Sequence, residues 1–216
     1  FIANDAFCAT LAELRVGAGR DASNLLMLTL GTGIGGGVAI DNKVIRGPRQ
    51  LIGEIGHMTL DPNGPPCGCG NHGCFEALAG RDAIIDRAIR KLQAGRASKL
   101  MSMCEGDLSR IDPAMIAAAA QEGDEVAAEV MAETGYWIGI GICNGIVFVD
   151  PDLVVLGGGI AAAGEVLFEP IRRTVAARSR ISYGKFDASQ IVPAKLGNEA
   201  GIYGAGQLVW ERLEEG

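Results

Sequence analysis

The stretch GTGIGGG, residues 31–37, follows the apolar run NLLMLTL and contains five glycines in seven positions. Glycine has no Cβ, so a loop of this kind lets backbone N–H groups come close to a phosphate. Gly31, Gly33 and Gly36 also satisfy the dinucleotide pattern G-x-G-x-x-G, which is typical of dehydrogenases. The pattern alone therefore leaves open which phosphate the loop would hold.

The residues after this loop argue against a dinucleotide fold. The segment GVAIDNKVIRG, residues 37–47, consists of two short β-type runs about an Asp41-Asn42 turn, which predicts a hairpin. A dinucleotide fold instead needs its third glycine to open a helix that receives the pyrophosphate. Glu54 lies near the place of a ribose-binding acid, but the surrounding IGEIGH is typical of a loop. We therefore disfavour a dehydrogenase.

Composition narrows the class of protein. The chain has 216 residues, of which 48% are hydrophobic, enough for a packed core. The net charge is −7 with both signs interspersed, so an electrostatic nucleic-acid surface is not expected. The most apolar stretch, residues 137–149, is shorter than the roughly 18 to 20 residues that span a bilayer, and we predict no membrane span.

The chain starts at Phe1, with no signal-peptide pattern. The first six residues, FIANDA, are typical of a strand end that runs into a helix start. Natural domains rarely begin there, so we expect the sequence to be a piece of a longer protein.

Hydrophobic spacing and capping residues predict alternating helices and strands. Asn4 or Asp5 is expected to cap a first helix that stops at Gly17 and Gly19, and Asp112 to cap another that starts at Pro113. Further helices are predicted over 76–95, with Gly80 as a breaking point, over 124–150, with a buried C-terminal half, over 164–180, and from about residue 199. Strands are predicted over 24–30, 150–157 and 190–196. This alternation indicates an α/β fold.

Pro170 falls inside the helix predicted over 164–180, where we expect it to kink or restart the helix. The strand over 150–157 leads into the glycines 157–159, which makes it a second strand-to-glycine unit like the first.

Six cysteines without an export signal favour thiols or metal ligands over disulfides. Cys8, Cys104 and Cys143 have apolar neighbours and are predicted to be buried thiols. Cys67, Cys69 and Cys74 form C-x-C-x4-C within eight residues. With His57 or His72 as the fourth ligand they make a tetrahedral Cys3His set, which predicts a structural zinc; the alternative is a cluster of loop thiols.

Five motifs occur together in this chain: NDA at 4–6, LGTGIGGGVA at 30–39, GEIGH at 53–57, CGCGNHGCFE at 67–76 and LGGGI at 156–160. Their order and approximate spacing resemble those of the ROK family of sugar kinases and sugar-responsive repressors, over essentially the whole chain. The resemblance implies the actin-like ATPase (ribonuclease H-like) fold, mainly its larger C-terminal lobe, with an inserted zinc-binding loop at 57–76. Residues 1–198 would form this lobe.

The resemblance also implies roles for particular residues. Asp5 matches the catalytic base that takes the proton from the sugar hydroxyl, although its place also suits a simple helix cap. Asn4, Glu54, His57 and Glu76 match the other sugar contacts. The histidine of this motif both ligates zinc and faces the sugar in the family, which favours His57 over His72 as the fourth ligand.

Two glycine loops would bind ATP with Mg²⁺. Gly31, Thr32 and Gly33 match the second phosphate loop, near the transferred phosphoryl group, and Gly157, Gly158 and Gly159 match the adenosine-side loop. The family's N-terminal lobe, with its Asp-x-Gly-Gly-Thr phosphate loop, has no counterpart in these residues. We therefore expect residues 199–216 to form a terminal helix that packs on that lobe, and the isolated fragment to be inactive.

The resemblance is strongest to bacterial glucokinases, which implies phosphorylation of a hexose at its 6-hydroxyl, in glycolysis, by a cytoplasmic homodimer. N-acetylmannosamine kinase is one alternative. A sugar-responsive transcriptional repressor is another, because it would share this half and differ by an upstream helix-turn-helix. A zinc-dependent interaction module would leave both glycine loops unexplained.

Overall fold

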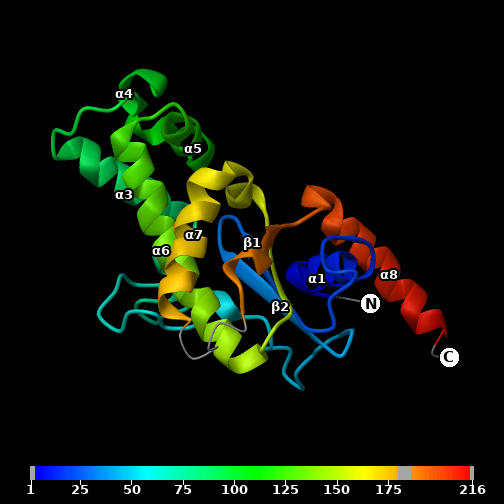
Figure 1. Ribbon diagram of the computed structural model, residues 1–216. Helices are drawn as coiled ribbons and strands as arrows, with labels where there is room; N and C mark the ends of the chain where they lie inside the picture. Colours follow the sequence, from blue (N-terminus) through cyan, green and yellow to red (C-terminus); the bar gives the residue numbers. More distant parts are fainter. Residues whose placement is uncertain (1–2, 180–185, 215–216) are drawn as a thin grey trace.

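The computed structural model describes residues 3–179 and 186–214 (Figure 1). The strands are β1 (Leu25–Leu30), β2 (Ile34–Ile40), β3 (Lys43–Val44), β4 (Leu153–Gly157) and β5 (Ile191–Pro193). The helices are α1 (Asp5–Val16), α2 (Phe75–Ala79), α3 (Arg81–Gln93), α4 (Leu100–Met103), α5 (Pro113–Gln121), α6 (Glu125–Val149), α7 (Glu165–Arg178) and α8 (Ala200–Glu214). Short 3-10 helices are η1 (Ile55–His57), η2 (Leu108–Arg110), η3 (Gly159–Ala163), η5 (Ala188–Gln190) and η6 (Gly197–Glu199).

One five-stranded sheet organises the chain, in the order β3-β2-β1-β4-β5. β1 pairs antiparallel with β2 and parallel with β4, and β4 pairs parallel with β5. Thr29, near the end of β1, lies opposite Gly157 at the end of β4. The two glycine segments therefore leave the sheet at the same edge, although the sequence separates them widely.

The predicted hairpin is present, and the loop before it is shorter than the glycine run suggests. Asp41 and Asn42 both have positive φ, 49° and 60°, as a two-residue hairpin turn requires. β2 already begins at Ile34, so only residues 31–33 form a loop. A Cβ on Gly37 would lie 2.0 Å from Thr10 Oγ1 of α1, so this strand glycine lets the helix pack closely on the sheet. No helix opens at Gly36, as a dinucleotide loop would need.

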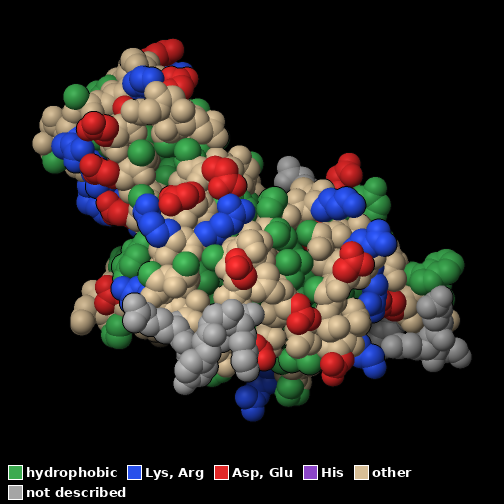
Figure 2. Space-filling view, in the orientation of Figure 1, with side chains coloured by type: hydrophobic (Ala, Val, Ile, Leu, Met, Phe, Trp, Pro, Cys, Tyr) green, Lys and Arg blue, Asp and Glu red, His purple; other side chains and the backbone are tan. Residues whose placement is uncertain are grey.

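Helices cover both faces of the sheet (Figure 1). α1 and α8 pack together on one face, and α6 and α7 pack together on the other. The side chains of β1 divide accordingly: Leu25 and Met27 belong to the smaller core cluster, Leu26 and Leu28 to the larger one. α3, α4 and α5 project away from the sheet, and the space-filling view shows a broad hollow between this projection and the part built by α1 and α8 (Figure 2).

Several helix boundaries follow the sequence signals. Asn4 caps α1, because its Oδ1 accepts hydrogen bonds from the N–H groups of Ala6 (2.9 Å) and Phe7 (3.2 Å). Asp112 caps α5 in the same way through Met115 N–H. Gly80 separates α2 from α3 as expected. α7, however, runs unbroken through Pro170, so the expected restart there is wrong; the proline Cβ instead faces the bare backbone of Gly135 on α6.

The C-terminal half of α6 is only partly buried. Ile138, Ile142 and Ile146 are inside the core, but Val147 is 55% exposed and Phe148 85% exposed, which corrects the expectation of a fully buried half. α6 is long and apolar enough, by length and composition, to cross a membrane. Its contacts with α7 and α5 are those of a core helix.

Candidate active site and metal centre

Asn4 and Asp5 stand at the exposed start of α1. Asn4 uses its Oδ1 to cap the helix, which leaves the amide Nδ2 available to a ligand. Asp5 Oδ1 accepts a hydrogen bond from Ala6 N–H at 2.8 Å, and no described residue occupies Oδ2. The cap is therefore Asn4, and Asp5 keeps one carboxylate oxygen for chemistry.

Asp5 lines a cavity of about 190 Å³ at the edge of the sheet where the strands end. Thr29, Gly157 and Gly158 form one wall of this cavity. The start of α8 and the residues before it form another wall, made of Gly197, Ala200 and Gly201. The carboxylate and the second glycine loop thus face the same space.

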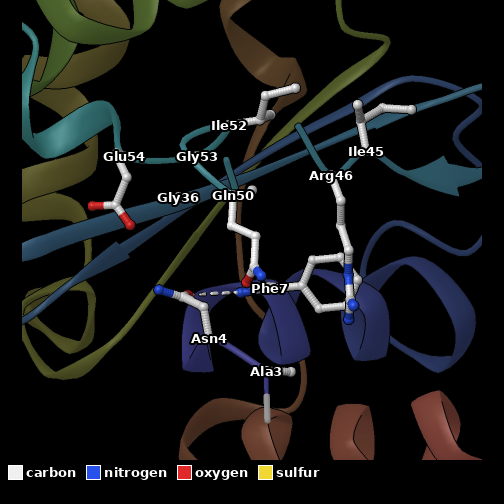
Figure 3. Close-up of a pocket in the computed structure, with 11 residues that line it drawn as sticks. Ala3, Asn4, Phe7, Gly36, Ile45, Arg46, Gln50, Ile52, Gly53 and Glu54 are labelled. Carbon is white, nitrogen blue, oxygen red and sulfur yellow. Dashed lines mark hydrogen bonds between the residues drawn. The ribbon is translucent and has the colours of Figure 1, made fainter. Parts of the chain in front are cut away.

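A second, adjoining pocket lies between α1 and the segment that follows the hairpin (Figure 3). Figure 3 shows the Glu54 carboxylate and the Asn4 amide nitrogen turned toward the same side. Arg46 stacks over the Phe7 ring, with its Cζ 3.9 Å from the ring centre, and Gln50 also lines the pocket. These last three residues were missed in the sequence, because no motif distinguishes them from ordinary loop and helix residues.

Glu76, on α2, contacts the end of the first glycine loop. Its Oε2 accepts a hydrogen bond from Ile34 N–H at 3.0 Å, directly after that loop. A Cβ on Gly33 would lie 2.1 Å from the same oxygen. Arg81 N–H at the start of α3 donates to Gly31 O at 3.2 Å. α2 and α3 therefore hold residues 31–33 in place through these contacts, which we call the brace, and Glu76 is one of the residues that form it.

This brace predicts the effect of Gly33→Ala. The added methyl would collide with Glu76 Oε2, and one of the two must shift by about an ångström. The resemblance to the ROK family implies that this loop binds a nucleotide. Because a misplacement of that size near reacting groups costs on the order of 10²-fold in rate, we expect kcat/KM for the nucleotide to fall by about 10- to 100-fold. Steady-state kinetics of the complete protein measure this, with a melting curve to show that the variant folds. An unchanged kcat/KM would contradict the brace.

His57, Cys67, Cys69 and Cys74 gather into one cluster, with their ligand atoms all within 4.8 Å of one another. Cys67 Sγ lies 3.8 Å from His57 Nδ1, and the Cys69 and Cys74 sulfurs are 3.6 Å apart. His72 is not in this group among the described residues; its backbone instead bridges to Pro66. Three thiols and one imidazole are the donors that tetrahedral zinc prefers, so the residues present fit such an ion.

The thiols of the cluster differ in their environments. Burial, followed by the hydrogen bonds that the Cys74 thiol donates to Cys69 and Cys67, raises the pKa of Cys74 to about 12. The pKa of Cys69 is lowered, chiefly by a backbone hydrogen bond from Asn71. A metal ion that binds here would displace the Cys74 proton, because the thiolate is the ligand. All six cysteines are free; Cys8 and Cys104 are buried as predicted, and Cys143 is half-buried.

The sheet, its two neighbouring glycine loops and the helices on either face define one lobe of the actin-like ATPase fold. The model of the ROK family matches residues 1–212. The chain belongs to the ROK family.

Three similar proteins show the breadth of that family. A glucokinase of Streptomyces coelicolor is 34% identical over 212 residues, which cover 97% of this chain and 67% of the relative. The crystal structure of a ROK family glucokinase from Streptomyces griseus, in complex with glucose and AMPPNP, aligns with a TM-score of 0.88 at 34% identity, over 96% of this chain and 67% of that one. A ROK family transcriptional regulator, a homolog of the E. coli MLC protein, aligns with a TM-score of 0.84 at 32% identity, over 95% of this chain and 50% of that one. The chain thus spans about two thirds of the kinases and half of the regulator.

Proposed function

We propose that the complete protein is a hexose kinase that transfers the γ-phosphoryl group of ATP to the 6-hydroxyl of a hexose, with glucose as the leading substrate. One observation carries the proposal: Asp5 and the loop at Gly157 and Gly158 line a single cavity. A kinase needs its base and its nucleotide loops within one space, because phosphoryl transfer depends mainly on positioning. Such a reaction belongs at the entry of glycolysis, in the cytoplasm.

In this mechanism Asp5 Oδ2 orients the 6-hydroxyl and accepts its proton as the hydroxyl oxygen attacks the γ-phosphorus, while the bond from that phosphorus to the bridging oxygen breaks and ADP leaves. The other sugar hydroxyls are held by Asn4 Nδ2, His57 and the carboxylates of Glu54 and Glu76, because these groups together offer hydrogen-bond donors and acceptors. The backbone N–H groups of Thr32 and Gly33 would face the transferred group, since the Gly31 N–H donates to Gly33 O at 3.0 Å. Mg²⁺ would neutralise charge on the phosphates.

Zinc held by His57, Cys67, Cys69 and Cys74 would act structurally, with no open position for catalysis. Glu54 lies three residues before His57, and Glu76 two residues after Cys74. The ion would therefore fix the ends of a loop that carries two of the sugar-binding residues.

The nucleobase would fit a cavity of about 160 Å³ between α5 and η3. Gly159 and Ile160, directly after the second glycine loop, line one side of it, and Ala114, Ala117 and Ala118 of α5 line the other. Small apolar side chains leave room for a flat purine ring. This arrangement would place Gly157, Gly158 and Gly159 on the adenosine side of ATP.

The remaining third of the molecule would be an N-terminal lobe with the other phosphate loop. α8 exposes an apolar face, including Ile202 (77% exposed), Trp210 (62%) and Leu213 (74%), and a lobe packed there would cover it. Residues 199–216 are in this view the joint between the lobes, and residues 1–198 the C-terminal lobe. The fragment alone would be inactive, and the complete protein a homodimer.

A sugar-responsive repressor is the second candidate, because the ROK transcriptional regulator aligns with this chain almost as well as the glucokinase does. N-acetylmannosamine kinase differs from the leading proposal only in the sugar. The complete gene product, assayed for ADP release with glucose, mannose and N-acetylmannosamine, separates the candidates. We expect turnover with glucose to exceed that with the other sugars. No turnover with any hexose, together with sugar-dependent release from DNA, would establish the repressor instead.

A further inference from the structure

α1 and α8 touch at backbone distance on one face of the sheet (Figure 1). A Cβ on Gly204 would lie only 1.8 Å from Cys8 O, so the two helix backbones meet there without an intervening side chain. Arg15 and Glu211 form an ion pair farther along, with Nε and Oε1 2.7 Å apart. The helix that carries Asp5 is therefore joined to the last helix of the chain by a close backbone contact and an ion pair.

Glu13 is the buried group at this junction. Its side chain is fully inaccessible, and no described Lys or Arg forms an ion pair with it. Its carboxylate instead accepts three backbone hydrogen bonds: from Ala18 N–H at 2.7 Å, Leu196 N–H at 2.8 Å and Lys195 N–H at 3.2 Å. Hydrogen bonds to a carboxylate offset the cost of its burial. The arrangement is specific for an acceptor with two oxygens.

These hydrogen bonds join α1 to the segment that leads from β5 into α8. Gly197, the next residue along, and Ala200 and Gly201 of α8 line the cavity that Asp5 also lines. Glu13 lies eight residues after Asp5 on the same helix, about 12 Å along the axis at 1.5 Å per residue. A rigid helix held at Glu13 therefore fixes Asp5 relative to the opposite wall of the cavity.

We propose that Glu13 is a positioning residue for phosphoryl transfer: its carboxylate locks α1 to residues 195–196 and so sets the place of Asp5 beside the second glycine loop. The inference rests on the proposed kinase function. Nothing in the motif set singles out this residue, since a glutamate in an amphipathic helix is ordinarily a surface residue.

The test is Glu13→Gln in the complete protein. Gln has the same shape, but its NH₂ group would face one of the backbone N–H donors, so the lock loosens. Because a misplacement of about 1 Å at reacting groups costs on the order of 10²-fold, we expect kcat to fall by 10- to 100-fold at saturating ATP and hexose. The KM for the hexose should change less than threefold, because three of the four other proposed sugar contacts, Glu54, His57 and Glu76, lie on other elements and only Asn4 lies at the start of α1. A purely structural role would not produce this split.

Thr134→Val is the matched control. Thr134 is also fully buried and accepts a hydrogen bond from Arg87 Nη1 at 2.9 Å, on α6 and away from the cavity. Both variants are expected to melt at lower temperature, and only Glu13→Gln should lose kcat when measured well below both melting points. Equal kcat values in the two folded variants would overturn the proposal. An inactive wild type would instead refute the kinase function itself.

Glu13→Asp keeps the test decisive if Glu13→Gln does not fold. Aspartate keeps the charge but withdraws the carboxylate by one methylene, so it cannot reach both Ala18 N–H and the 195–196 segment. A reduced kcat with a nearly unchanged hexose KM supports the lock. A wild-type kcat in a folded Glu13→Asp protein overturns it.

Discussion

Replacement of Asp5 by Asn is expected to lower kcat of the complete protein by about 10²- to 10⁴-fold, the contribution of a positioned general base. The amide keeps an oxygen that can accept the Ala6 N–H, so the start of α1 should persist. It removes the proton acceptor that faces the cavity shared with Gly157 and Gly158. The KM for the hexose should change only a few-fold, since the proposed mechanism assigns sugar binding to other side chains as well. Steady-state kinetics with saturating ATP provide the measurement.

Asp187→Asn is a suitable control for this variant. Asp187 also begins a short helix and accepts a backbone hydrogen bond, from Ser189 N–H at 2.7 Å, but it lines neither pocket at the α1 terminus. It should retain wild-type kcat. If Asp5→Asn kept kcat within threefold of wild type, Asp5 would be no more than a residue in the first turn of α1.

Loss of the metal should have the second large effect. We expect the purified complete protein to contain one zinc ion per chain, and Cys74→Ser to lose it. Zinc binding to such a donor set supplies on the order of 10 kcal/mol in small zinc domains, so the loop at residues 57–76 should lose its fixed geometry. Glu54 and Glu76 flank that loop, and hexose binding should therefore weaken by at least about tenfold. Metal analysis and calorimetric titration with glucose test the two parts.

The matched variant is Cys143→Ser, which removes a half-buried thiol outside the cluster. It should keep both the metal and the hexose affinity. Stoichiometric zinc in Cys74→Ser, or no zinc in the wild type, would contradict the Cys3His assignment. If Cys74→Ser lost zinc without any change in hexose affinity, the ion would still be structural, but the expected dependence of hexose binding on the zinc loop would be wrong.

Local signals predicted most of the fold. Caps at Asn4 and Asp112, the break at Gly80 and the Asp41-Asn42 turn all act over a few residues, so their sequence patterns are sufficient. The sequence did not predict that β2 starts inside the glycine run. Gly37 is required there because α1 approaches the strand closely, and not because the chain forms a loop. The exposure of Phe148 likewise depends on which elements pack against α6, and the hydrophobic periodicity of the sequence gives no information on those neighbours.

The candidate site also has features that the sequence predicted and features that depend on tertiary packing. The ligand cluster of His57 and the three cysteines came from spacing and from the family motif, and the structure brings these residues together. Glu76 was predicted as a sugar contact, and its bond to Ile34 N–H depends on the packing of α2 under the loop. Glu13 was not predicted, because two of its three donors, Lys195 N–H and Leu196 N–H, come from a segment far away in the sequence.

The position of the phosphate in the product tests the central claim most directly. The complete gene product would be incubated with ATP and glucose, and the product examined by two-dimensional ¹H–³¹P NMR. The proposed mechanism predicts a phosphorus atom coupled to the two protons on carbon 6 of the sugar. A phosphate on another carbon, or no phosphorylated sugar from glucose, mannose or N-acetylmannosamine, would contradict it.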